Sequence, residues 1–191
     1  MNEVLAIMLW PAVTSFVCGL LATAWYLGVF RKIEFRLGKI PNITFVHQQG
    51  QGPYEEVGPL FDKITKFMKD HDLKQCKTAG IYYDDPKTTK TPRYALGFLV
   101  NAEQLKLFKT IDVKFLKEYI LLDIKETETA VSEFPSRKVS IVSFALSAIK
   151  TYSAFNRQTK YKLNSGTMEI YYDDFIATHF PQQNFEQFCP Q

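Results

Sequence analysis

The chain has 191 residues, of which 46% are hydrophobic and 15% aromatic, so it can bury one substantial core. The net charge of +3 comes from lysines and arginines scattered among acids. This argues against DNA or RNA as a partner, because such binding needs a basic stripe. The cysteines lie too far apart for a metal motif or a disulfide framework, which is typical of a reducing compartment: Cys18, Cys76 and Cys189.

The residues from Val4 to Phe30 form an apolar run without a charge. A helix rises about 1.5 Å per residue and the hydrocarbon core of a membrane is about 30 Å thick, so the run 4–30 predicts a transmembrane helix. Arg31 and Lys32 follow it, whereas the short segment before it carries only Glu3. By the positive-inside rule we expect the rest of the chain to lie in the cytosol.

A cleaved signal peptide is the alternative interpretation of the same run. Ala22-Thr23-Ala24 offers a small-residue cleavage site, and Asn42 opens a glycosylation sequon. Against cleavage, the segment before the run has no positive charge and the apolar residues continue past Ala24. The sequence therefore favours a retained single-pass anchor.

Hydrophobic periodicity after this run predicts two similar sets of elements. The first set begins with a strand that ends at His47. An amphipathic helix over 59–73 follows, and then two strands over 78–86 and 92–100. A short helix near 101–110 leads to the second set. This set is two strands, a helix and two more strands, over 118–124, 127–134, 139–158, 167–175 and 176–181. The second long helix has a predicted apolar face made of Val142, Leu146, Ile149 and Tyr152.

The five letters IYYDD occur at 81–85 and again at 170–174, each time on the strand that follows the helix of its set. A shared segment at equivalent positions indicates an internal pseudo-repeat. We therefore expect an α+β fold built from two strand-helix-strand-strand units, preceded by one transmembrane helix.

These two units, with GIYYDDP in the first and MEIYYDD in the second, resemble the GyrI-like effector-binding domain over residues 40–181, leaving 182–191 as a short tail. An apolar anchor followed by PNIT is similar to animal endoplasmic-reticulum-phagy receptors that carry such a domain. The resemblance implies an endoplasmic reticulum membrane protein that acts as an adaptor in reticulum turnover or quality control. The tail has no aromatic-x-x-aliphatic motif, so contact with autophagy machinery would be indirect, through an unknown protein partner.

Glu169 and Tyr171 are the candidate ligand-binding residues. A strand places alternate residues on one face, so these two side chains share a face of the last unit's first strand. The repeat aligns Glu169 with Gly80, so only one unit carries an acid there. The resemblance implies that this glutamate binds small hydrophobic cationic molecules, or in some members hydrolyses them. Two alternatives remain: an ordinary surface glutamate, and a groove filled by its own side chains.

No other pattern indicates catalysis. His47, His71 and His179 are isolated, without the spacing of metal ligands, and no phosphate loop or nucleophile elbow is present. The sequence therefore predicts a binding domain without a metal or cofactor rather than an enzyme.

Overall fold

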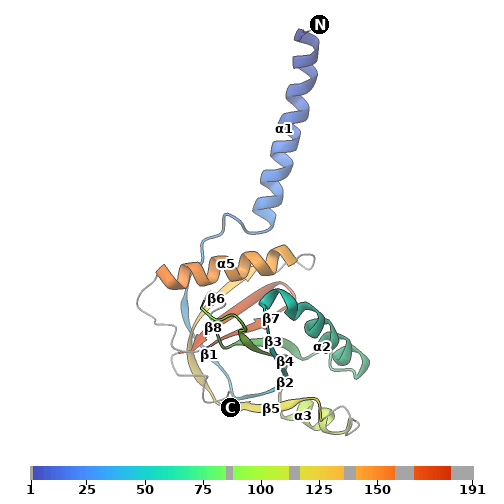
Figure 1. Ribbon diagram of the computed structural model, residues 1–191, viewed down its shortest axis with the longest axis vertical. Coiled ribbons are helices and arrows are strands. Elements are labelled where there is room, and N and C mark those ends of the chain that lie inside the picture. The colour runs from blue at the N-terminus through green and yellow to red at the C-terminus, as the bar shows by residue number, and fades with distance from the viewer. Residues whose placement is uncertain (1, 85–87, 112–116, 136–140, 158–165, 182–191) are drawn as a thin grey trace.

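The computed structural model describes residues 2–84, 88–111, 117–135, 141–157 and 166–181. It has the α+β architecture expected from the sequence: a curled, eight-stranded antiparallel sheet with helices, preceded by a separate N-terminal helix (Figure 1). The predicted tail at 182–191 lies outside the described residues.

The N-terminal helix α1 (Asn2–Tyr26) stands away from the sheet (Figure 1). Its segment Leu9–Tyr26 is long and apolar enough to cross a membrane, and none of that segment is buried against the rest of the chain. The helix ends before the predicted boundary at Phe30, because Gly28 takes a positive φ of 79° that L side chains rarely adopt. The span itself stays a prediction.

The first unit contains a helix between two pairs of strands. Its elements are β1 (Arg36–Ile40), β2 (Ile43–Gln51), the short 3-10 helix η1 (Tyr54–Val57), α2 (Gly58–Asp70), β3 (Lys77–Tyr82) and β4 (Arg93–Val100). Helix α3 (Ala102–Lys109) follows, held at its start by the capping residue Asn101.

The second unit repeats this order. Its elements are β5 (Ile120–Ile124), β6 (Thr127–Pro135), α5 (Ile141–Arg157), β7 (Thr167–Tyr171) and β8 (Phe175–Pro181). The sequence did not predict strand β1. Its short, mostly exposed sequence shows no alternation, and it is ordered by pairing with β6 of the other unit.

The strand order β1-β6-β8-β7-β3-β4-β2-β5 makes the repeat visible. Exchanging each strand of one unit with its counterpart in the other gives the same order read from the opposite edge, so the sheet has a pseudo-twofold axis between β3 and β7. The first strand of each unit also pairs with a strand of the other unit: β1 pairs with β6, and β5 pairs with β2. The two units therefore form one sheet and one domain.

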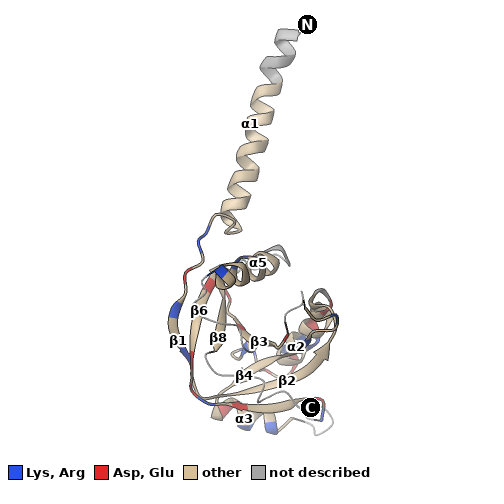
Figure 2. Cartoon of the chain, turned by 60° about the vertical axis from the view of Figure 1, so that its left-hand side comes forward, with Lys and Arg blue, Asp and Glu red and all other residues tan. Residues whose placement is uncertain are grey.

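Helices α2 and α5 lie on the same face of this sheet (Figure 2). Ile64 and Phe67 of α2 pack in one apolar cluster with Phe98 of β4. Phe155 of α5 stacks on Phe180 of β8, with ring centroids 4.0 Å apart. The space over β3 and β7 thus lies between the two helices.

The face that α5 buries differs from the predicted one. The stripe that is buried consists of Ser147, Thr151 and Phe155, whereas Ile149 is 64% exposed. Leu146 and Tyr152 are half-buried, and the side chain of Val142 lies outside the described part. The prediction was wrong because it assumed that the buried face of an amphipathic helix must be its most apolar face.

Candidate functional site

Glu169 lies at the centre of the sheet, on the face that carries the two helices. Its cross-strand neighbours are Gly80 on β3 and Thr178 on β8. The spacing that relates the two IYYDD segments also relates Gly80 to Glu169, so repeat counterparts are here direct neighbours across the pseudo-twofold axis. Only 8% of Glu169 is exposed, which excludes an ordinary surface glutamate.

A chain of tyrosine hydroxyls leads to the Glu169 carboxylate. The Tyr171 hydroxyl donates to Glu169 Oε2 at 2.9 Å, and the Tyr82 and Tyr171 hydroxyl oxygens are 2.8 Å apart. Tyr82 occupies in the first unit the position that Tyr171 occupies in the second. The pseudo-twofold axis therefore places two equivalent tyrosines beside a single acid.

Aromatic rings from both helices cover this hydroxyl chain. Phe61 of α2 and Phe144 of α5 lie 5.2 and 5.6 Å from the Tyr171 ring, measured between centroids. The two phenylalanine rings are 6.2 Å apart, so the helices meet above Tyr171. On the other side, Tyr54 of η1 packs edge-on against Tyr82 at 4.9 Å. The site is closed in this conformation by its own aromatic side chains.

Burial is the main cause of the shifted pKa values in the site. It raises the pKa of Glu169 to about 7, and the hydrogen bond from Tyr171 opposes the rise only in part. Burial and the nearby Glu169 charge also raise the pKa of Tyr171 and of Tyr152 well above the ordinary value. Among the described residues, no lysine, arginine or histidine forms an ion pair with Glu169. Ionised Glu169 is thus a buried negative charge that has no cationic partner in the described part of the chain.

Comparison with protein families shows the family of this domain. The family model of the GyrI-like small molecule binding domain matches residues 33–185, which is most of the chain. The chain belongs to the GyrI-like small molecule binding domain family. The comparison with curated proteins gave no match.

Solved structures of several other proteins are similar to this chain. SAV2435 bound to tetraphenylphosphonium is 10% identical, with a TM-score of 0.55 over 81% of this chain and 96% of that one. EcmrR in a complex with DNA is 12% identical, with a TM-score of 0.51 over 92% of this chain and 68% of that one. The integron cassette protein VCH_CASS2 of Vibrio cholerae is 11% identical, with a TM-score of 0.46 over 78% and 98%. At these identities the likeness to SAV2435 and to EcmrR shows the fold alone, and the likeness to VCH_CASS2 carries no argument.

The structure brings the two residues singled out from the sequence into direct contact. Their role in ligand binding stays a prediction, as does the resemblance to the reticulophagy receptor testis-expressed protein 264. The sequence prediction left out four aromatic residues that surround Glu169 and Tyr171: Tyr54, Phe61, Tyr82 and Phe144. For Tyr82 a signal existed, because the repeat makes it the counterpart of Tyr171. The phenylalanines come from separate helices, and no local pattern links them.

The acidic pair Asp84-Asp85 follows the first IYY segment, after the end of β3. Asp84 accepts hydrogen bonds from the Arg93 backbone and guanidinium, and this lowers the pKa of its carboxyl. These hydrogen bonds therefore join the end of β3 to the start of β4. Asp85 lies outside the described residues.

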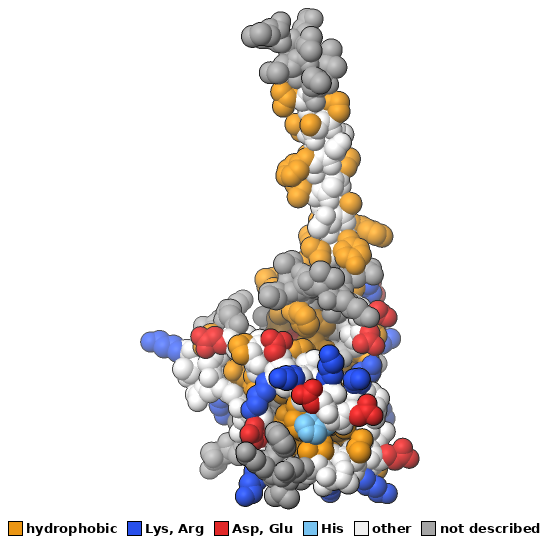
Figure 3. Space-filling view, turned by 90° about the vertical axis from the view of Figure 1, so that its right-hand side faces the viewer, with side chains coloured by type: hydrophobic (Ala, Val, Ile, Leu, Met, Phe, Trp, Pro, Cys, Tyr) orange, Lys and Arg blue, Asp and Glu red, His pale blue; other side chains and the backbone are white. Residues whose placement is uncertain are grey.

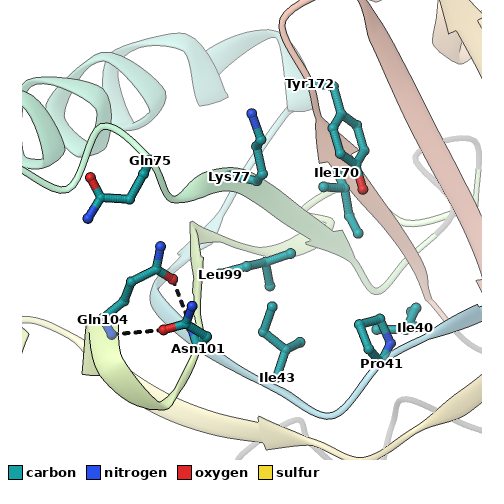
Figure 4. A pocket seen from close by; sticks show the side chains of 10 residues that line it. All are labelled: Ile40, Pro41, Ile43, Gln75, Lys77, Leu99, Asn101, Gln104, Ile170 and Tyr172. Carbon is teal, nitrogen blue, oxygen red and sulfur yellow. Dashed lines mark hydrogen bonds between the residues drawn. The ribbon is translucent and has the colours of Figure 1, made fainter. Parts of the chain in front are cut away.

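A pocket of about 200 Å³ opens on the face of the GyrI-like sheet opposite Glu169 (Figure 4). Ile170, Leu99 and Ile43 line its apolar part, and the polar groups of Asn101 and Gln104 at its rim bond to each other. Charges of both signs are mixed over the face of the domain in Figure 3, whereas the segment Leu9–Tyr26 of α1 carries none. The Glu169 site is the feature that combines burial, charge and aromatic surroundings.

Proposed function

We propose that this GyrI-like domain binds small hydrophobic cations between α2 and α5, with Glu169 as the counter-charge. The observation that carries the proposal is the buried Glu169 carboxylate, which has a tyrosine donor but no cationic partner among the described residues. A bound cation would supply that partner, and the rings of Tyr171 and Phe61 would contact its apolar groups and its charge. The tetraphenylphosphonium in the similarly folded SAV2435 supports this ligand class.

Entry of such a ligand requires the aromatic cover to open. Phe61 and Phe144 belong to different helices and meet only through their rings, so a change of their side-chain conformations would uncover Tyr171. Phe144 is already 39% exposed, so we expect it to lie at the entrance. The buried Glu169 and Tyr171 then form the base of the site.

The test is a titration of tetraphenylphosphonium against the full chain in lipid nanodiscs, at a pH above 7, by isothermal titration calorimetry. We expect Glu169→Gln to weaken binding by more than about tenfold, because a charge-assisted contact contributes about 1.5–3 kcal/mol. Glu103→Gln, on the exposed start of α3, is the matched control and should bind like the wild type. Equal affinities of wild type and Glu169→Gln, or binding to neither, would contradict the proposal.

A second part of the proposal concerns the membrane. We propose a single-pass protein of the endoplasmic reticulum membrane with its domain in the cytosol, supported by the apolar segment Leu9–Tyr26 and by Arg31 and Lys32 after it. Protease added to intact microsomes should then remove the domain. A protected domain, or a glycan on Asn42, would instead support a lumenal position.

The adaptor role rests on the resemblance to testis-expressed protein 264. We propose that a separate protein partner links this domain to reticulum turnover, so the chain alone should not bind ubiquitin-like autophagy modifiers strongly. A binding measurement with the purified full chain decides this. Strong binding would mean that the chain contains a recruitment motif of its own.

A further inference from the structure

Four hydroxyl groups beside the Glu169 site are buried and have no hydrogen-bond partner within the described structure. They belong to two strands and to helix α5: Ser132, Ser147, Thr151 and Thr178. Each of these residues is at most 2% exposed. A buried hydroxyl without a partner loses the hydrogen bonds that it made to water, so four of them in one region require an explanation.

The two strand hydroxyls continue directly from the Glu169 carboxylate across the sheet. Thr178 on β8 is the register partner of Glu169, and Ser132 on β6 is the register partner of Thr178. Register partners in an antiparallel sheet point to the same face, with Cβ atoms about 4.5–5.5 Å apart. Glu169, Thr178 and Ser132 therefore form a polar row beneath α5.

The two helix hydroxyls face this row from above. Ser147, Thr151 and Phe155 are four residues apart and form the buried stripe of α5. Phe155 stacks on Phe180, which lies two residues after Thr178 on the same face of β8. The stripe therefore points at the sheet, with Ser147 and Thr151 between the Phe155 contact and the contact of Phe144 with Tyr171.

An apolar side chain at any of these positions would pack without an unpaired hydroxyl, as the neighbouring Phe155, Phe180 and Ile176 do. Without a ligand, the unpaired hydroxyls therefore destabilise the folded protein. A ligand that supplies donors and acceptors would form hydrogen bonds with them. We infer that the site takes a hydrophobic amine that carries hydroxyl groups close to its nitrogen, with the ammonium at Glu169 and the hydroxyls at Thr178 and Thr151. This inference rests on the proposed function and names the ligand class more closely.

Long-chain aminodiols of membranes and water-soluble amino alcohols share this chemistry. Helix α5, which supplies Phe144, also contacts the segment after α1, because Lys150 donates to the carbonyl oxygens of Gly28, Val29 and Arg31. Binding is therefore measured with the amine dissolved in the aqueous phase and, separately, with a long-chain form already in the nanodisc bilayer. A response to the second form alone identifies a lipid source.

The experiment uses a matched pair of ligands: an aminodiol with a dodecyl chain and the same chain with the amine but no hydroxyls. Each is titrated, below its micelle concentration, against the full chain in nanodiscs. We expect the wild type to prefer the aminodiol by about tenfold, which corresponds to one or two net hydrogen bonds. Thr151→Val and Thr178→Val should remove most of this preference, because they weaken binding of the aminodiol more than binding of the plain amine. Thr65→Val, whose hydroxyl lies on the exposed side of α2, is the control and should keep the preference.

A readout of stability accompanies the binding measurement. Thr151→Val and Thr178→Val remove unpaired buried hydroxyls and should unfold at the same temperature as the wild type or higher. Lower unfolding temperatures would mean that the hydroxyls serve the fold, and would overturn the inference. So would equal wild-type affinities for the two ligands. In that case the proposed function survives if the plain amine still binds and depends on Glu169, whereas failure of both amines and of tetraphenylphosphonium ends both proposals.

Discussion

Gly80 and Glu169 are counterparts in the internal repeat and are also paired directly across β3 and β7. The pseudo-twofold axis of the domain runs between them. A glutamate at both positions would put two like charges side by side in a buried place, which is strongly unfavourable. The asymmetry of this one pair lets a symmetric fold hold a single charge at its centre.

The first prediction concerns the space at Gly80. A Cβ atom there would meet Leu96 Cδ2 at 2.8 Å and the Tyr82 ring at 3.2 Å, and both are side-chain groups that can move. We expect Gly80→Ala to change the free energy of unfolding by less than about 1 kcal/mol, because alanine also restricts the unfolded chain. Urea denaturation followed by circular dichroism measures this.

Gly97→Ala is the contrasting variant. Its Cβ would lie 1.9 Å from the Val46 carbonyl oxygen and 2.7 Å from His47 Cα, which are backbone atoms of the paired strand β2. Relief requires the strands to separate, so we expect a loss of roughly 3 kcal/mol. If both variants lose the same stability, the crowding at the two glycines does not differ in the way that the distances indicate.

The second prediction is the pH dependence of stability due to Glu169. Its pKa is about 7 in the folded protein against an ordinary value of 4.5. Between these two pH values the folded state keeps a proton that the unfolded state has lost, so stability falls as pH rises and then stays constant above about pH 7. The total is on the order of a few kcal/mol. Glu169→Gln lacks this loss and should be the more stable protein above pH 7.

The measurement compares the two proteins rather than the wild type alone. Burial, with a smaller contribution from Arg36, lowers the pKa of His179 to about 4, and this makes stability rise with pH over part of the same range. Glu169→Gln and the wild type share that contribution, so it cancels in the difference of their free energies of unfolding. A difference that stays constant from pH 4.5 to 7 would show that Glu169 titrates normally.

The fold was largely predictable from the sequence, whereas the site was only partly so. The strands of alternating pattern, the helix α2 and the repeat were all visible, because local periodicity reflects one buried face. Strand β1 and the cover of Phe61 and Phe144 were not visible, since they depend on contacts between the units. The buried face of α5 was predicted wrongly for a related reason: Ser147 and Thr151 face a polar row on the sheet, not an apolar core.

The third prediction separates the roles of the two site tyrosines. Tyr171→Phe keeps the ring between Phe61 and Phe144 but removes the hydroxyl that donates to Glu169. Without that donor the carboxylate is less stabilised, so the pKa of Glu169 should rise above 7 by about one or two pH units. The affinity for tetraphenylphosphonium, whose charge is permanent, should then reach its plateau at a higher pH than in the wild type.

Tyr82→Phe is the matched control for this shift. The Tyr82 hydroxyl contacts Tyr171 and not the carboxylate, so its removal should move the pH midpoint much less. If Tyr171→Phe lowers the affinity equally at every pH, the tyrosine acts on the ligand through its ring and not through Glu169.

The last prediction concerns Lys150, which joins helix α5 to the segment after α1. Its ammonium group donates to the carbonyl oxygens of Val29 and Arg31 at 2.5 and 2.6 Å, in addition to that of Gly28. Lys150→Met keeps the length of the side chain and removes all three donors. We expect faster hydrogen exchange at residues 27–31, whereas the unfolding midpoint of the domain stays within the error of the wild-type value, because the sheet and its core are untouched. Lys66→Met, on the exposed side of α2, should change neither quantity.

The same helix α5 also supplies Phe144 to the cover of the site. A ligand that displaces Phe144 should therefore alter exchange at residues 27–31 in the wild type, and this response should disappear in Lys150→Met. If Lys150→Met exchanges like the wild type with and without tetraphenylphosphonium, the bonds from Lys150 do not hold the segment after α1. A response to the ligand that persists in the variant would mean that the site and this segment communicate by another route.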